Sequence, residues 1–70
     1  MATHRKIVKS TKEVIAAFGG TLECARRWDV TKQAVSNWRK DGIPTGYHCR
    51  MEHSLEASGY VVDVSKLGWI

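Results

Sequence analysis

Apolar residues recur with helical spacing in four segments of this chain, and short polar or glycine-containing stretches separate the segments. We predict a first helix after Ser10, a second from Leu22 to Trp28, a third from Thr31 to Lys40 and a fourth after Thr45. The last stretch, residues 60–70, differs because its β-branched and aromatic residues favour a strand. The pattern therefore predicts a mainly α domain of four helices, with a possible short β segment at its C-terminal end.

Capping residues set the expected limits of the first two helices. Ser10 and Glu13 have the spacing of a capping box, so the first helix is expected to begin beside them. Gly19 and Gly20 end that helix, because tandem glycines readily adopt the conformations of a helix C-cap. Thr21 then has the identity expected of the N-cap of the second helix.

A tight turn is expected between the second and third helices. Asp29 follows the second helix, and aspartate is one of the few residues besides glycine that tolerate the left-handed conformation. Thr31 carries the hydroxyl expected of the next N-cap. The residues expected to face the core are Leu22, Ala25 and Trp28 in the second helix, Thr31, Ala34, Val35 and Trp38 in the third, and Tyr47, Met51 and Leu55 in the fourth.

The third predicted helix combines one apolar stripe with one polar face that has no carboxylate. The polar face consists of Lys32, Gln33, Ser36, Asn37, Arg39 and Lys40. A helix face that is merely solvated usually carries Glu and Lys pairs at i,i+4 spacing. Amide, hydroxyl and lysine side chains instead match the hydrogen-bonding groups on base edges. We therefore interpret this segment as the DNA-reading helix of a helix-turn-helix.

Length and charge support a single module with a polyanionic partner. Seventy residues with 43% hydrophobic content make one small domain, too small for a catalytic cleft with its own supporting shells. The formal net charge of +4 and the pI near 9.4 favour nucleic acid as the partner. We expect no enzyme activity, no cofactor and no small-molecule substrate.

The sequence also bears on location, redox state and metal binding. No apolar run approaches the roughly 20 residues of a membrane span, and the N-terminus lacks the apolar core of a secretory signal. We expect a cytoplasmic protein that joins the nucleoid when bound to DNA, with Cys24 and Cys49 as reduced thiols. His48, Cys49 and His53 could be zinc ligands, but a structural site usually takes four ligands and no second pair follows, so we predict no metal.

Both ends of the chain leave alternatives open. Residues 1–9 are polar and basic, and they suit a frayed terminus, a basic arm on phosphates or a short edge strand that pairs with the C-terminal segment. Residues 60–70 carry an apolar cluster, Leu67, Trp69 and Ile70, that a small monomer has difficulty covering. This segment either folds back over the fourth helix or joins two copies of the chain. Residues 10–59 would form the helix-turn-helix domain between these ends.

Residues 21–40, together with Gly42, Ile43 and Pro44, resemble the helix-turn-helix of the Cro and lambda-type repressor superfamily, particularly its small phage-type or YdaS-like regulators. The positions that carry the resemblance are Ala25, Trp28, Val30, Thr31, Ala34, Val35, Ser36, Asn37 and Trp38. Asp29 stands where the family usually has glycine. The resemblance implies a four-helix domain of the lambda-repressor and Cro type, acting as a phage or prophage transcriptional repressor that excludes RNA polymerase from an operator.

The resemblance also implies roles for individual residues. Base reading falls to Lys32, Gln33, Ser36 and Asn37, and the residues expected to contact phosphates are Thr21, Arg26, Arg27, Thr31, Arg39 and Lys40. One helix reads only a few base pairs, so we expect a homodimer on a double-stranded operator with an inverted repeat. The dimer contact is assigned to Val62, Val64, Leu67, Trp69 and Ile70. The alternative is a protein-interaction module, such as an antitoxin, that acts through residues 60–70.

Overall fold

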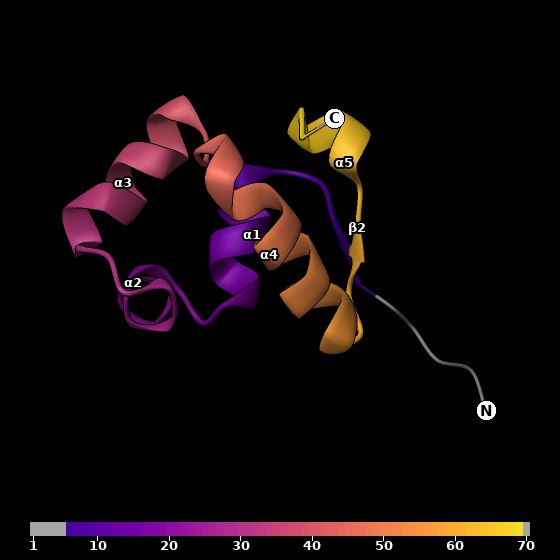
Figure 1. The fold of residues 1–70 in the computed structure, drawn as a ribbon, viewed down its shortest axis with the longest axis horizontal. Coiled ribbons are helices and arrows are strands. Elements are labelled where there is room, and N and C mark those ends of the chain that lie inside the picture. Colours follow the sequence, from indigo (N-terminus) through magenta and orange to yellow (C-terminus); the bar gives the residue numbers. More distant parts are fainter. Residues whose placement is uncertain (1–5, 70) are drawn as a thin grey trace.

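The computed structural model describes residues 6–69, and within that range the chain is mainly helical (Figure 1). The elements in chain order are β1 (Ile7–Val8), α1 (Thr11–Ala17), α2 (Thr21–Trp28), α3 (Lys32–Asp41), α4 (Thr45–Ala57), β2 (Val61–Val62) and α5 (Val64–Leu67). The four predicted helices are confirmed, and α5 is an additional short helix that the sequence pattern did not indicate. None of the helices within residues 6–69 combines the length and apolar character needed to span a bilayer.

Helix α1 begins at the predicted cap, with one difference in the hydrogen bonds. The Ser10 hydroxyl accepts a hydrogen bond from the backbone N–H of Glu13 at 3.2 Å. The Glu13 carboxylate accepts from the backbone N–H of Lys9 at 2.8 Å, one residue earlier than a capping box requires. Gly19 and Gly20 follow the helix with φ near 100°, a conformation that favours glycine, and they end it as predicted.

Helix α2 begins one residue earlier than expected. Gly20 occupies the N-cap position and Thr21 is the first helical residue, so the prediction that Thr21 caps this helix is wrong. The prediction that Leu22 faces the core is also wrong, because half of its surface is exposed. Cys24 is fully buried beside Ala25 instead. In a helix of two turns, either the side that carries Leu22 or the side that carries Cys24 could face the core. Contacts with the other helices bury the side that carries Cys24.

The turn between α2 and α3 has the predicted geometry. Asp29 adopts the left-handed conformation, with φ 56° and ψ 50°, and the backbone N–H of Val30 donates to the carbonyl of Ala25 at 2.9 Å. The Thr31 hydroxyl then caps α3 by accepting from the backbone N–H of Ala34 at 3.1 Å. Thr31 is exposed in this position, so the expectation that it faces the core is wrong. The predicted pair of helices joined by a tight turn is therefore confirmed.

Helix α4 buries the predicted residues but begins differently. Pro44 is its N-cap and Thr45 is already helical, so Thr45 does not cap the helix as predicted. Met51 and Leu55 are almost fully buried, and Tyr47 packs against them at the edge of the core. The helix ends before Ser58 and Gly59, as the sequence indicated.

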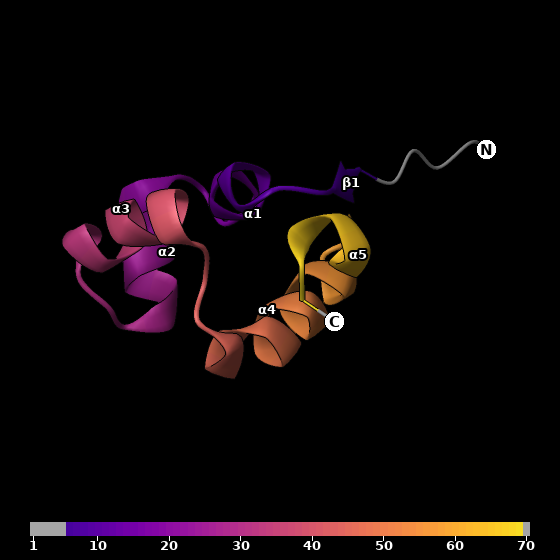
Figure 2. The same ribbon diagram turned by 90° about the horizontal axis from the view of Figure 1, so that it is seen from above.

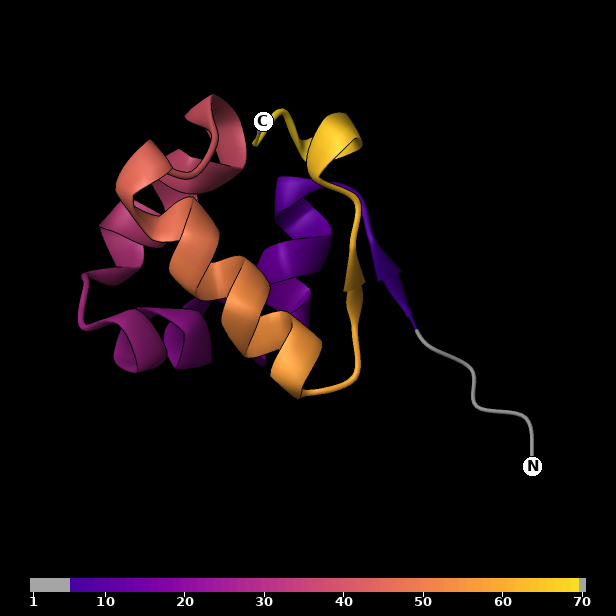
Figure 3. The same cartoon turned by 45° about the vertical axis from the view of Figure 1, so that its right-hand side comes forward.

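The N- and C-terminal strands form a small parallel sheet, whose two arrows lie side by side in Figure 3. Figure 2 shows β1 leading into α1. Ile7 pairs with Val61 and Val8 with Val62, so the edge-strand alternative holds for these two N-terminal residues. Val8 and Val62 point into the core, whereas Ile7 and Val61 are exposed on the outer face. The strand then ends early, because the side chain of Asp63 caps α5.

One continuous core joins the helices to the sheet. Its buried residues are Val8, Val14, Ile15, Cys24, Ala25, Val35, Trp38, Ile43, Met51, Leu55 and Val62. The half-buried Phe18 and Trp28 pack edge to face at a centroid distance of 5.4 Å, and Tyr47 lies 5.1 Å from the Trp38 ring. The apolar face of α3 therefore packs against the core, and its polar face is exposed to solvent.

Candidate nucleic-acid interface

Helix α3 presents its polar face to solvent because its apolar face is held by the core. Val35 is fully buried and Trp38 is 6% exposed. Opposite them, the exposed side chains are Lys32, Gln33, Asn37, Arg39 and Lys40, while Ser36 is half-buried at the edge of this face. The structure thus brings the four predicted base-reading residues, Lys32, Gln33, Ser36 and Asn37, together on one side of one helix. That surface consists of positive charges and uncharged hydrogen-bonding groups.

Two of these residues are already connected. Gln33 donates from Nε2 to Oδ1 of Asn37 at 3.2 Å, one turn further along the helix. This bond uses one donor of Gln33 and one acceptor of Asn37, which leaves the Gln33 oxygen and the Asn37 NH₂ group available. An adenine edge offers one donor and one acceptor in the major groove, so the paired amides can still complement it. The i,i+4 spacing of the two amides was visible in the sequence, although the pairing was not predicted.

Two residues predicted from the sequence to contact phosphates, Thr21 of α2 and Arg39 of α3, form a hydrogen bond with each other. Arg39 donates from Nη2 to the hydroxyl oxygen of Thr21 at 2.9 Å. The bond joins the last turn of α3 to the first turn of α2. It orients one guanidinium edge toward Thr21 and leaves its other N–H groups free for an acceptor. Lys40 is exposed beside Arg39 in the same turn, and Thr31 serves as the N-cap described above.

The two arginines of α2 have different surroundings from Arg39. Arg26 forms an exposed i,i+3 ion pair with Glu23 at 3.5 Å, a contact that contributes little to stability. Arg27 turns toward α4, where Nη2 donates to the hydroxyl of Ser54 at 3.2 Å. The structure therefore brings Thr21 and Arg39 together but places the Arg27 guanidinium against a different helix.

The C-terminal segment folds back on its own chain. Val62 is 9% exposed and belongs to the core of the single chain, so its assignment as a dimer contact stays a prediction. Val64, Leu67 and Trp69 are half-buried against the same core, and Ile70 lies outside the described residues. This is the arrangement in which the segment completes the core of a single chain.

A contact between the tail and α4 was not predicted. The Trp69 ring stacks on His48, with centroids 4.6 Å apart and planes 11° from parallel. Nε2 of His48 lies against the carbonyl oxygen of Ile43, which places the ring hydrogen on that nitrogen. Ile43 belongs to the connection that follows α3, so the tail supports the segment that leads out of this helix. No local signal in the sequence indicated this contact, because it depends on how the tail folds.

The two thiols differ in their surroundings. Burial raises the pKa of the Cys24 thiol, and the charge of Arg39 opposes that shift in part. Cys49 is exposed and unpaired in the described part of the chain. Within residues 6–69, no three His, Cys, Asp or Glu side chains gather as metal ligands.

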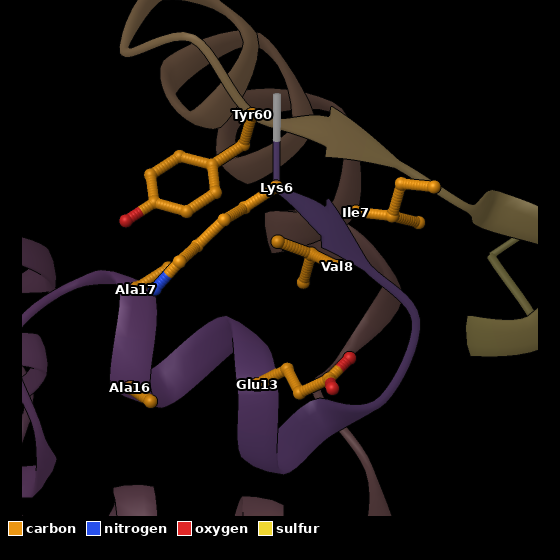
Figure 4. Close-up of a pocket in the computed structure, with 7 residues that line it drawn as sticks. All are labelled: Lys6, Ile7, Val8, Glu13, Ala16, Ala17 and Tyr60. Carbon is orange, nitrogen blue, oxygen red and sulfur yellow. The ribbon is translucent and has the colours of Figure 1, made fainter. Parts of the chain in front are cut away.

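A hollow of about 300 Å³ lies between β1 and α1 (Figure 4). Val8, Glu13, Ala16 and Tyr60 are among the residues that line it. The Lys6 side chain runs along it toward the end of α1, where a positive charge is favourable next to the helix dipole. We interpret this hollow as a structural feature of the packing between strand and helix.

Comparison with known proteins agrees with this geometry. No curated protein and no solved structure matches the chain. A family model described as the DNA-binding transcriptional regulator Cro matches residues 10–53, which extend from the cap of α1 into α4 and include the whole helix-turn-helix. The match covers more than half of the chain. The protein therefore belongs to the family of DNA-binding transcriptional regulators typified by Cro.

Proposed function

We propose that this protein is a phage or prophage Cro-like repressor that recognises a specific duplex operator through α3. The observation that carries the proposal is the exposed face of α3 from Lys32 to Lys40, which has base-reading side chains and no carboxylate; the acidic Asp41 is the last residue of the helix. Asn37 and Gln33 suit adenine, Lys32 suits guanine, and Ser36 can donate to or accept from several base edges. Family membership supports the DNA partner.

In this proposal the phosphate contacts come from residues that flank the reading face, namely Arg39, Lys40 and the Thr21 hydroxyl. The bond between Arg39 and Thr21 orients these two side chains toward each other. Contacts to phosphates add affinity that depends on salt and carry little sequence information. Replacing Arg39 by Ala should therefore weaken binding to all duplexes alike. It should also flatten the dependence of affinity on salt by about one phosphate contact.

Selection of bound sites from random duplex DNA tests the proposal directly. Enrichment of a short motif repeated in inverted orientation supports an operator read by a two-fold dimer, with reading helices in successive major grooves about 34 Å apart. Absence of enrichment, with binding that depends only on salt, would contradict sequence-specific recognition.

We propose that two copies of the chain form a homodimer through the outer face of the β1–β2 sheet. The exposed apolar side chains there are Ile7 and Val61, which are neighbours on the outer face of the sheet, and the half-buried Val64, Leu67 and Trp69 lie next to them in the chain. Val61→Lys tests this placement because it adds charge to an exposed position without disturbing the core. Analytical ultracentrifugation should show dimers of the parent chain at micromolar concentration and monomers of the variant. Equal masses for both would rule out this surface.

A further inference from the structure

A broad hollow lies between the end of α2 and α4, and none of its lining residues belongs to α3. Its volume is about 710 Å³, and its principal lining residues are Arg27, Trp28, Tyr47, Arg50, His53 and Ser54. Ala57, in the last turn of α4, marks its far end. Figure 1 shows that α4 leads away from α3 toward this turn, and Figure 3 shows α4 in front with α2 beside it. The hollow thus belongs to a second surface of the domain.

Two arginines in this hollow lie over aromatic rings. The guanidinium carbon of Arg27 lies 4.8 Å from the centroid of the Trp28 ring, and its Nη2 is fixed by Ser54. The guanidinium carbon of Arg50 lies 5.3 Å from the centroid of the Tyr47 ring. A guanidinium that already stacks on a ring has fewer conformations, so it loses less conformational entropy when it binds an anion. Both guanidinium groups are therefore preorganised to bind an oxyanion.

Neither arginine is neutralised by the chain itself. Within residues 6–69 the single ion pair joins Arg26 to Glu23, and neither Arg27 nor Arg50 has a carboxylate within ion-pair distance. Asp29 lines the hollow but does not pair with either of them. Trp28, Tyr47 and Ala57 make the lining of the hollow partly apolar. The indole N–H of Trp28 is buried and donates to no acceptor in the described part of the chain.

We propose that this hollow binds an acidic segment of a partner protein. Two carboxylates of the segment would pair with Arg27 and Arg50, and an apolar or aromatic side chain between them would pack on Tyr47 and Trp28. Charge complementarity identifies the partner as acidic, and the concave, partly apolar floor favours a projecting peptide side chain over the convex backbone of duplex DNA. Because the hollow extends along α4 rather than α3, such a partner can bind while the reading face is occupied.

The chain offers a matched control for the test. Arg27→Gln/Arg50→Gln removes both stacked charges, whereas Arg26→Gln removes a charge from the same helix and does not touch the hollow. All these residues are exposed, so the variants should fold, and circular dichroism melting checks that they do. The probe is a pool of labelled synthetic peptides with two fixed Glu residues separated by up to three Leu, Phe or Trp residues. An otherwise identical pool carries Lys in place of Glu.

The expected result is binding of the Glu pool to the parent chain, measured by fluorescence anisotropy. A shift of the Trp28 indole N–H signal in NMR spectra should accompany it, with the signal assigned by its loss in Trp28→Phe. The double variant should weaken this binding by about tenfold or more, since two charge-assisted contacts are lost. Arg26→Gln should leave it unchanged, the Lys pool should not bind, and a saturating duplex should not displace the Glu pool.

Three outcomes would overturn the proposal. The first is failure of the Glu pool to bind or to shift the Trp28 signal. The second is equal binding by the parent chain and the double variant. The third is a loss of duplex affinity in the double variant far beyond that in Arg26→Gln, without peptide binding, which would assign the hollow to the DNA footprint. None of these depends on whether a specific operator is recovered, so failure here is distinguishable from failure of the proposed repressor function.

Discussion

The amide pair on α3 allows a quantitative test of base reading. Replacing Asn37 by Ala removes its own base contact and the acceptor that orients Gln33 at 3.2 Å. An exposed i,i+4 side-chain bond contributes only about 0.2–0.5 kcal/mol in the free protein, so folding should hardly change. A bidentate amide contact to a base discriminates by about 1–3 kcal/mol, which corresponds to a loss of roughly 5- to 150-fold in affinity for the operator.

The same pair should make the two substitutions non-additive. Once Asn37 is gone, the Gln33 amide is no longer oriented, so its further removal should cost less than it does in the parent chain. We expect a coupling of at least about 0.5 kcal/mol between the two substitutions in a double-mutant cycle. Alanine has the highest helix propensity, so α3 should keep its structure in all three variants.

The assay is fluorescence anisotropy with the selected operator and a scrambled duplex at one fixed salt concentration. Ser65→Ala in α5 is the matched control, because it changes an exposed polar residue that lies outside the helix-turn-helix. Both single variants should lose operator affinity and keep their affinity for the scrambled duplex. If Asn37→Ala and Gln33→Ala both discriminate between the duplexes as well as the parent chain does, α3 is not the reading helix.

Three further predictions concern the core, the tail and the thiols. Ala25 is 4% exposed, so Ala25→Leu should overpack the core and lower the free energy of unfolding by about 1–3 kcal/mol, and an unchanged melting temperature would contradict this. Trp69→Ala should cost about 1–2 kcal/mol through the lost stack on His48, and Trp69→Phe should recover part of that loss in the same melting experiment. Because folding raises the pKa of Cys24, its contribution to stability is complete below the unfolded-state pKa and falls as pH rises toward the folded-state pKa. Iodoacetamide at about pH 8 should therefore modify Cys49 and spare Cys24 in the folded chain, as mass spectrometry of peptides would show.

Local sequence signals predicted the helix-turn-helix well. Ser10, Thr31 and Asp29 each act through bonds or backbone angles within a few residues, and the structure has all three as predicted. Residue spacing alone also predicted which face of α3 is exposed. Once Trp38 is buried, the opposite side of the helix faces solvent.

The errors arose where two local solutions were nearly equivalent. Gly20 and Thr21 are both acceptable N-caps, and the structure uses Gly20. Leu22 and Cys24 lie on alternative apolar stripes of one short helix, and neighbouring helices determine which stripe is buried. Pro44 takes the N-cap position of α4 and leaves Thr45 inside the helix.

Contacts between distant segments could not be predicted from spacing. The stack of Trp69 on His48 and the bond from Arg39 to Thr21 both depend on the packing of whole elements. The hollow between α2 and α4 is of the same kind, because Arg27 and Arg50 come from separate helices. In each case the residues were visible in the sequence, but their partners were not.

The parallel pairing of β1 with β2 has a consequence for how the chain folds during synthesis. Val8 contributes to the core, yet its strand partner Val62 is translated only after all of α1 to α4. Pairing of segments so distant in sequence carries a loop-closure cost and is slow compared with helix formation. On the ribosome the helices can therefore assemble while one side of the core is still uncovered. The domain is closed only when β2 leaves the exit tunnel, so a ribosome that stalls before Val62 would hold a chain with Val8 unpaired and open to misassembly.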